Sequence, residues 1–184
     1  MDLIERSQGG DENAFAELYH QYKNLVYKTA YLMLDDPAEA EDALQEVFLK
    51  VHRSLDSYKP TRGAFTTWLY RITVNHCLNR KRRRRWRFLS WAQVPPHQVP
   101  THPSPESRQS EQDAVARAIR QLSDKLRAVV VLRYYADMSY AEISQTLDLP
   151  LGTVKSRLNA AVRTLRAEIQ SSAPGALPDE EVAK

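Results

Sequence analysis

Basic side chains concentrate in two separate segments of this 184-residue chain. Residues 80–87 hold seven basic residues and no acid, and residues 150–167 hold four basic residues and no acid. Residues 35–46 show the opposite pattern, with six acids and no base, although the formal net charge of the whole chain is only +3. Blocks of like charge repel one another, so we expect partners of opposite charge. For either basic block alone, a solvated helix face or an import signal is the alternative.

The basic block at 150–167 falls in the second of two short helical segments, 139–147 and 152–169, that a tight turn joins. This layout is typical of a helix-turn-helix, whose second helix enters the major groove of DNA. Arg and Lys side chains bind guanine or phosphate, Asn pairs with adenine, and amides at the helix start near Thr153 can hold a phosphate. A helical hairpin with a basic surface is the alternative. The polar side of the second helix carries Ser156, Asn159 and Arg163, flanked by Lys155 and Arg166.

A second nucleic-acid candidate is the segment 65–87, which combines aromatic, amide and cationic side chains. This mixture suits bases that stack on aromatic rings while cations hold the backbone. The preceding loop 56–64 could enclose an extruded base. Trp68 also falls on the apolar stripe, so a place in the core is the alternative for it. The candidates are Tyr58, Lys59, Thr61 and Arg62 in the loop, and Trp68, Tyr70, Arg71, Asn75 and Asn79 in the helix.

Apolar residues at steps of three and four predict the helices that position these side chains. We expect helices over 11–34, 37–55 and 65–87, and a second helical unit over 111–170 in which Ser139 and Glu142 form a capping box. Five prolines lie in residues 89–110, which predicts a semi-extended, flexible linker. The fold class is therefore all-α. Two small helical domains, 1–88 and 111–170, should each have their own interior, followed by a disordered tail, 171–184.

Composition excludes several classes of protein. The single cysteine, Cys77, rules out an internal disulfide framework. No apolar run approaches the roughly 20 residues that span a bilayer, and the first residues lack the order of a secretory signal. We therefore expect a cytoplasmic protein that does not insert into a membrane.

Four motifs resemble known sequences. Residues 42–51 (DALQEVFLKV) and 65–75 (FTTWLYRITVN) resemble region 2 of bacterial sigma factors, and residues 139–144 (SYAEIS) and 152–158 (GTVKSRL) resemble region 4. The small size, with two helical modules and a bare linker, is similar to the extracytoplasmic-function (ECF) group. The resemblance covers roughly residues 10–170 and has both motif sets in the expected order.

The resemblance implies a protein that directs core RNA polymerase to promoters and starts their opening, with no cofactor and no enzymatic activity of its own. It implies contacts with the β′ clamp and β flap of the polymerase, passage of the linker through the RNA exit path, and regulation by an anti-sigma factor. The polymerase-binding residues would be Asp42, Gln45, Glu46, Leu49 and Arg53. The −10 element would meet loop 56–64 (Tyr58, Lys59, Thr61, Arg62) and the helix residues Trp68, Arg71, Asn75, Asn79 and Arg80. The −35 element would meet Thr153, Lys155, Ser156, Arg157, Asn159 and Arg163.

The linker length agrees with this interpretation. Twenty-two residues at about 3.1 Å each reach roughly 70 Å. Promoter elements about 25 base pairs apart are roughly 85 Å apart on the duplex at about 3.4 Å per pair, and two modules of about 13 Å radius close the difference. The arginine-rich run 80–87 is longer than in most relatives, and it could grip the upstream duplex or meet an acidic partner.

Two other functions are open at this stage. A stand-alone helix-turn-helix regulator would bind promoter duplex by itself, usually as a dimer with a sensing module. A metal-dependent enzyme could use Glu39, Asp42 and Glu46, which share one helical side, but the chain has no Glu-x-x-His pair. Acidic stripes on helices are usually solvated, and His76 and Cys77 point in different directions on a helix, so we expect no metal site.

Overall fold

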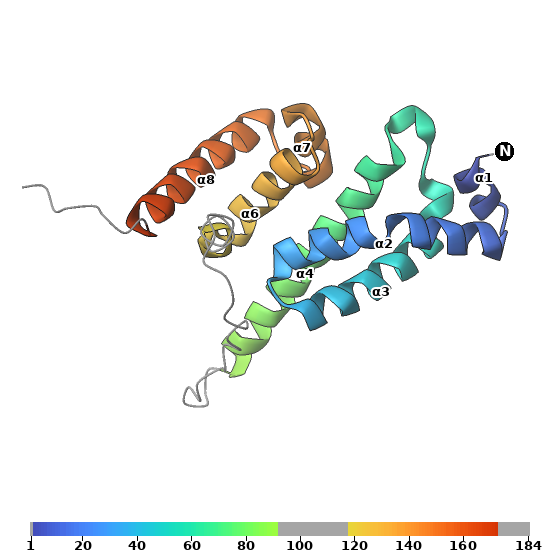
Figure 1. Ribbon diagram of the computed structural model, residues 1–184, viewed down its shortest axis with the longest axis horizontal. Helices are drawn as coiled ribbons and strands as arrows, with labels where there is room; N and C mark the ends of the chain where they lie inside the picture. Colours follow the sequence, from blue (N-terminus) through green and yellow to red (C-terminus); the bar gives the residue numbers. More distant parts are fainter. Residues whose placement is uncertain (1, 92–117, 173–184) are drawn as a thin grey trace, which may run out of the picture.

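The computed structural model describes residues 2–91 and 118–172, with side chains for 2–86 and 118–169. Within these ranges the chain forms helices and turns without strands, which confirms the all-α class (Figure 1). Most of the predicted linker and of the predicted tail lies outside the described residues. Both boundaries shift, because the helix expected to end near 87 continues to Trp91 and the last helix continues to Ser172. No helix in the described ranges is long and apolar enough to cross a membrane.

The first module contains α1 (Leu3–Gln8), α2 (Glu12–Leu34), α3 (Pro37–Ser54) and α4 (Phe65–Trp91). Side-chain caps fix the starts of α2 and α3. Asp11 accepts a hydrogen bond from the amide of Ala14, and Asp36 accepts one from the amide of Glu39. Between α2 and α3, Asp35 adopts the left-handed conformation that ends a helix (φ 61°), and proline follows in the first turn of α3.

Two short 3₁₀ turns, η1 (Leu55–Ser57) and η2 (Pro60–Arg62), connect α3 to α4. The backbone of Gly63 has a φ of 134°, which side chains other than hydrogen disfavour. The phenol of Tyr58 donates a hydrogen bond to the carbonyl of Gly63 at 3.1 Å. This hydrogen bond joins two residues of the loop between α3 and α4 and so fixes the shape of the loop.

The second module contains helical residues 118–121, α6 (Asp124–Val130), a π-helical turn η3 (Val131–Tyr135), α7 (Tyr140–Leu147) and α8 (Leu151–Ser172). The capping box of Ser139 and Glu142 is present as predicted. Asp148, with a φ of 52°, ends α7 in the left-handed conformation, so that α8 begins after a tight turn. The pair α7–α8 is therefore the predicted helix-turn-helix.

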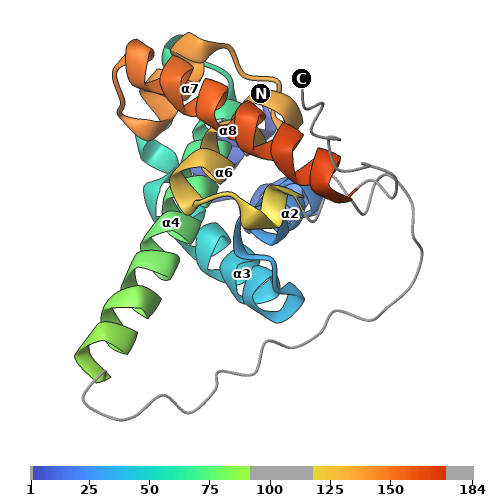
Figure 2. The same cartoon turned by 90° about the vertical axis from the view of Figure 1, so that its left-hand side faces the viewer.

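Three clusters of buried apolar residues hold this arrangement. One lies entirely in the first module and includes Leu18, Val47 and Leu69, and a smaller one, around Leu122, lies entirely in the second. The third cluster contains residues of both modules, from Ala30 and Met33 to Leu132, Ile143 and Leu158. We expected separate interiors, whereas the two modules are docked on one another in this structure, with α6 beside α2 and α7 beside α4 (Figures 1 and 2).

Polar contacts reinforce this docked arrangement. The buried guanidinium of Arg127 donates a hydrogen bond from Nη1 to the carbonyl of Met33 at 3.1 Å, and others to the carbonyls of Arg120 and Leu122. Burial lowers the pKa of Arg127. A salt bridge of 2.7 Å joins Lys81 in α4 to Asp124 at the start of α6.

Candidate nucleic-acid interfaces

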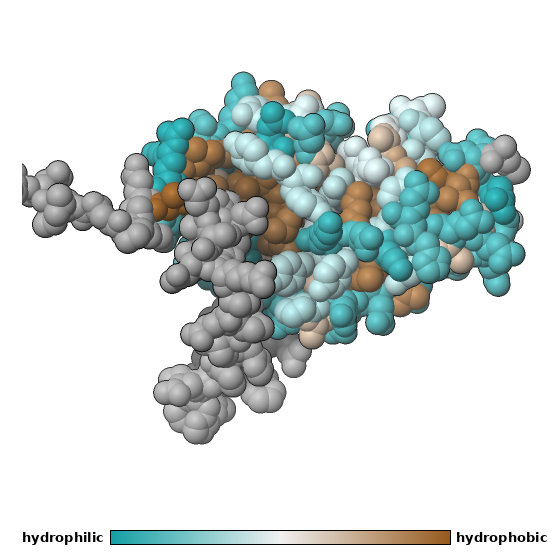
Figure 3. Space-filling view, in the orientation of Figure 1, coloured by the Kyte–Doolittle hydropathy of each residue, from teal (hydrophilic) through white to brown (hydrophobic). Residues whose placement is uncertain are grey.

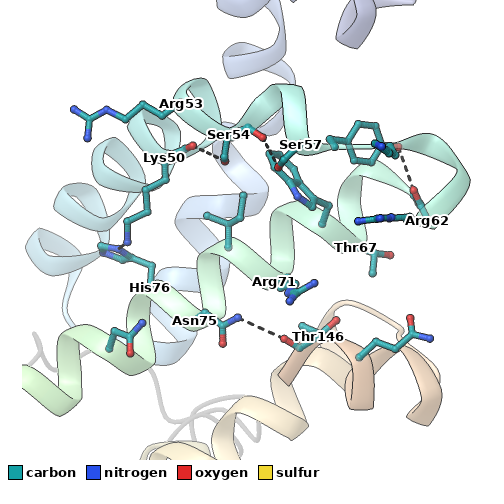
Figure 4. A pocket seen from close by; sticks show the side chains of 18 residues that line it. Lys50, Arg53, Ser54, Ser57, Arg62, Thr67, Arg71, Asn75, His76 and Thr146 are labelled. Carbon is teal, nitrogen blue, oxygen red and sulfur yellow. Dashed lines mark hydrogen bonds between the residues drawn. The ribbon is translucent and has the colours of Figure 1, made fainter. Parts of the chain in front are cut away.

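A cleft of about 710 Å³ lies where the end of α3, the two 3₁₀ turns, α4 and α7 meet (Figure 4). Cationic side chains from three elements line it, and its described lining includes no Asp or Glu. A concave surface with charge of one sign raises the local concentration of the opposite charge, so this cleft favours a polyanion. The lining cations are Lys50, Arg53, Lys59, Arg62 and Arg71.

The cleft brings together most of the residues predicted for the −10 element. Lys59, Arg62, Trp68, Arg71, Asn75 and Asn79 all line it, although the loop and helix residues are separate in sequence. Thr61 is exposed on η2 but is not part of the lining. The convergence supports a single nucleic-acid surface built from the loop and one side of α4.

Tyr58 also lines the cleft, but most of its side chain is covered by neighbouring rings. Its side chain is only 8% exposed, and its ring packs against Phe65 and Trp68 at centroid distances of 5.2 and 5.7 Å. Burial raises the pKa of the Tyr58 phenol. Because the ring is packed on both neighbours, Tyr58 shapes the wall of the cleft and does not present a free face to a base.

Arg80 also differs from its predicted role. It is not in the lining of the cleft, and its guanidinium faces α3, where it pairs with Glu39 (3.6 Å), Asp42 (3.1 Å) and Glu46 (3.5 Å). Hydrogen bonding to Asp42 and these three carboxylates raise the pKa of Arg80 against the opposing effect of burial. In this structure Arg80 therefore connects α4 to the acidic side of α3.

His76, for which we expected no metal-binding role, connects α3 to α4. Its Nδ1 lies 2.7 Å from Nζ of Lys50 (Figure 4). Its Nε2 lies 3.7 Å from a carboxylate oxygen of Glu46. Burial, followed by the charge of Lys50, lowers the pKa of His76, so the neutral ring accepts a hydrogen bond from the ammonium. This contact joins the cleft side of α3 to α4.

Within the described ranges, no three His, Cys, Asp or Glu side chains lie close enough to hold a metal ion. The adjacent Cys77 is fully buried, and burial raises its pKa to about 12. Glu39, Asp42 and Glu46, which suggested a metal-dependent enzyme, pair with arginine instead.

The predicted polymerase-binding residues form one exposed stripe along α3. All five are exposed, and at its centre Leu49 is 57% exposed although it is apolar. The spacing of three and four residues places them on one side of the helix. The stripe consists of Asp42, Gln45, Glu46, Leu49 and Arg53.

Helix α8 presents its two sides as predicted. Val154, Leu158 and Ala161 are buried, whereas Lys155, Ser156, Asn159 and Arg163 are exposed. Thr153 and Arg157 are half-buried. The docking of the two modules therefore leaves the polar side of this helix open.

Helix α7 forms one edge of the cleft. Gln145 and Thr146 are part of its lining, and the side-chain amide of Asn75 donates a hydrogen bond to the carbonyl of Thr146 at 3.5 Å (Figure 4). The second module therefore occupies space beside the surface that we assign to nucleic acid, and one of the assigned residues, Asn75, contacts it.

Comparisons with known proteins agree with both halves of the chain. The family described as Sigma-70 region 2 matches residues 18–87, and the family described as Sigma-70, region 4 matches residues 112–165. The first match contains α3, most of α4 and most of the cleft, and the second contains α7 and the greater part of α8.

Curated proteins resemble the chain along nearly its whole length. The ECF RNA polymerase sigma factor SigW of Bacillus subtilis is 33% identical over 178 residues, covering 91% of this chain and 95% of that protein. The ECF RNA polymerase sigma-E factor of Haemophilus influenzae is 34% identical over 181 residues, covering 91% of this chain and 94% of that protein.

Two solved structures have the same fold. CnrH in complex with the cytosolic domain of CnrY has a TM-score of 0.66 and 23% identity, covering 93% of this chain and 97% of that one. The sigma factor RpoE in complex with the anti-sigma factor NepR, from Bartonella quintana, has a TM-score of 0.68 and 22% identity, covering 86% of this chain and 98% of that one.

Proposed function

Because the chain belongs to the extracytoplasmic-function group of RNA polymerase sigma factors, which direct core polymerase to specific promoters and begin their opening, we propose how its surfaces divide that work. The first module opens the −10 element in its cleft, and the second reads the −35 element with α8. The observation that carries this assignment is the convergence of loop and α4 residues on one acid-free cationic cleft. A separated strand fits such a surface, because aromatic and amide groups can meet bases while cations hold phosphates.

In the cleft, each residue type has a distinct task. Lys59, Arg62 and Arg71 hold the backbone of the non-template strand, and Asn75 and Asn79 offer amides to base edges. Trp68, half-buried beside Tyr58, supplies an aromatic surface at the back of the site. Thr61, exposed at the tip of η2, meets the strand from the loop.

On α8, the exposed side chains meet the major groove of the −35 element. Lys155 and Arg163 are exposed cations for guanine or phosphate, and Asn159 between them can pair with adenine. The half-buried Thr153 lies in the first turn, where backbone amides bind phosphate. Ser156 and Arg157 complete this surface.

The exposed stripe of α3 meets the β′ clamp of the polymerase. Leu49 provides an apolar centre, and the surrounding charged and amide groups provide a polar rim, as in many protein interfaces. This binding and transcription itself take place in the cytoplasm, and the protein contributes recognition without an enzymatic reaction of its own. We further propose an anti-sigma factor as a regulator, because the structurally similar RpoE of Bartonella quintana forms a complex with the anti-sigma factor NepR.

Reconstituted transcription tests the assignment of the cleft. Core polymerase with Arg62→Ala/Arg71→Ala should bind promoter duplex but show reduced permanganate reactivity of −10 thymines, because fewer cations hold the separated strand. The matched control, Lys28→Ala, removes an exposed cation of α2 outside the cleft and should leave opening unchanged. Normal opening by the double variant would reject the assignment.

The other two surfaces are tested by binding measurements. Arg163→Ala should weaken binding to the −35 duplex with little change in stability, and Glu46→Lys should weaken competition for core polymerase. Tight binding of the promoter duplex by the protein without polymerase would instead favour a stand-alone regulator.

A further inference from the structure

Lys50 and His76 form a pair at the wall of the cleft, beside the residues assigned to the non-template strand. Lys50 comes from α3 and His76 from α4, and their side chains meet where the two helices pack together (Figure 4). Lys50 is exposed, whereas only 5% of His76 is exposed. The pair therefore joins a cation that can reach a bound strand to a buried ring that can titrate.

The ammonium of Lys50 is only partly used by this contact. It has three N–H donors, and one of them is directed at Nδ1 of His76 at 2.7 Å. Within the described residues, no ion pair involves Lys50. Because no carboxylate neutralises this ammonium, it keeps its charge for a phosphate in the cleft.

The second ring nitrogen of His76 is a buried donor that lacks an acceptor. In the tautomer that accepts a hydrogen bond from Lys50, the hydrogen is on Nε2. Among the described residues Nε2 has no hydrogen-bond partner, and a carboxylate oxygen of Glu46 lies 3.7 Å from it. This distance is too long for a hydrogen bond but suits an ion pair once the ring is charged. The ring therefore has one partner for each charge state, Lys50 when neutral and Glu46 when protonated.

Charges on two helices decide which state of the ring is populated. The charged groups that act on it are Lys50 and Glu46 of α3 and Arg80 and Arg83 of α4. The two lining residues that α7 supplies carry no charge. Burial lowers the pKa of His76 most, and the charge of Lys50 has the next largest effect. A phosphate bound at Lys50 offsets the effect of the ammonium on the ring, because its charge has the opposite sign.

We propose that Lys50 and His76 form a phosphate-binding subsite of the cleft at which binding is coupled to the uptake of a proton. This inference rests on the proposed function of the cleft. The ammonium of Lys50 keeps its three hydrogens and donates to a phosphate oxygen of the strand, and Nδ1 of His76 takes a proton from solvent. The protonated ring then pairs through its Nε2–H with Glu46.

The neighbouring residues favour a strand over a free anion as the ligand of this subsite. Arg53, about one turn from Lys50 on α3, and Asn75, next to His76 on α4, line the same cleft. A free phosphate ion would meet the cations but leave the amide without a partner. A strand offers phosphates and base edges together, so it can satisfy both kinds of group.

The affinity for the strand at a series of pH values tests the coupling. Reconstituted holoenzyme is titrated with a labelled single strand of −10 non-template sequence at constant ionic strength, between about pH 5.5 and 7.5. The variant His76→Gln keeps an acceptor for Lys50 but does not titrate. The matched control, His20→Gln, removes an exposed histidine of α2 outside the cleft. The ratio of each variant to wild type at the same pH cancels titration of the polymerase and of the DNA.

Wild type should gain about threefold in affinity relative to His76→Gln as the pH falls across this range, because the bound state holds more protons than the free state. His20→Gln should follow wild type. Lys50→Gln should bind the strand more weakly at every pH and should lose the gain. Because Lys50 is exposed, this second variant tests the coupling without disturbing the packing of the ring.

A constant ratio between wild type and His76→Gln at all pH values would overturn the inference and leave the proposed function intact. A gain that survives in Lys50→Gln would overturn it equally, since the ammonium would then have no part in the proton uptake. If wild-type holoenzyme does not bind the strand, or if Arg62→Ala/Arg71→Ala binds it equally well, the proposed function of the cleft fails and the inference fails with it.

Discussion

The two modules differ in how far each supplies its own hydrophobic interior. The first encloses an aromatic-rich cluster from α1 to α4, in which Leu69 is fully buried. In the described part of the second, the cluster confined to that module has only Leu122, Val130 and Ala161 as buried members. Its larger side chains, such as Leu132 and Ile143, belong to the cluster shared with the first module.

This difference shows what separation of the modules requires. When they part, apolar side chains around α6 and η3 lose neighbours contributed by α2 and α4, and apolar area exposed to water costs about 25 cal/mol per Å². Apolar residues already gather over α6 and α8 on the face shown in Figure 3, whereas hydrophilic residues cover most of the first module there. The second module therefore depends more than the first on contact with a partner surface, and the first is the more stable unit.

The largest expected effect comes from a matched pair of cavities. Leu69→Ala and Leu132→Ala each remove a fully buried side chain and should each cost about 2–5 kcal/mol of unfolding free energy. For Leu69→Ala, hydrogen exchange should show loss of protection in α2–α4. For Leu132→Ala, protection should be lost in α6–α8 and on the surface where the two modules are docked. Identical exchange patterns for the two variants would remove the distinction between the modules.

A smaller effect is expected at the buried guanidinium. Arg127→Met keeps the aliphatic bulk but leaves the carbonyl of Met33 without its donor, which should cost about 2 kcal/mol. The control Arg120→Met removes only a 3.8 Å ion pair with Asp35 and should cost less than about 0.5 kcal/mol. Urea unfolding of the full chain measures both, and equal losses would show that Arg127 has no special part in the docking.

The salt bridge between α4 and α6 should contribute about 0.5 kcal/mol to docking. Lys81→Glu or Asp124→Lys alone should shift the population toward separated modules, and the two together should restore docking. Dyes on cysteines introduced at exposed positions 41 and 166 report the distance between the modules. A double variant that is as open as the single variants would show that the pair does not hold the modules together.

The smallest effect concerns pH and the first module alone. The pKa of His76 is lowered from 6.5, so the folded chain binds fewer protons there than the unfolded chain does just below that pH. Its contribution to stability is therefore present above about pH 6.5 and is lost as the pH falls toward the lowered pKa. His76→Gln, which keeps an acceptor for Lys50, should flatten this dependence. Urea midpoints of the wild-type protein and of His76→Gln, measured at a series of pH values, test this expectation.

Local signals in the sequence predicted most helices. Asp36 and Pro37 at the start of α3, and Ser139 at the start of α7, set helix ends through contacts within three residues. Helix α1 was not predicted, because six residues show no apolar period. It is held from a distance, since the side chain of Gln8 donates to the carbonyls of Leu55 and Tyr58.

The docking of the modules does have a signal in the sequence, although we predicted separate interiors. Tyr70, Val74 and Cys77 form a second apolar stripe on α4, next to the stripe that the first module needs, and all three lie in the shared cluster. The pairing of Arg80 had no such signal, because its carboxylate partners are 34 to 41 positions away and only the packing of α3 on α4 brings them within reach.

The burial of Cys77 makes the chain convenient for experiments on its own motions. A thiol whose pKa is raised to about 12 stays protonated at neutral pH, and the thiolate is the form that attacks maleimides and oxidants. In the docked arrangement, reporter groups can therefore be attached at introduced surface cysteines while the native cysteine stays unlabelled, whereas labelling of Cys77 itself would report separation of the modules.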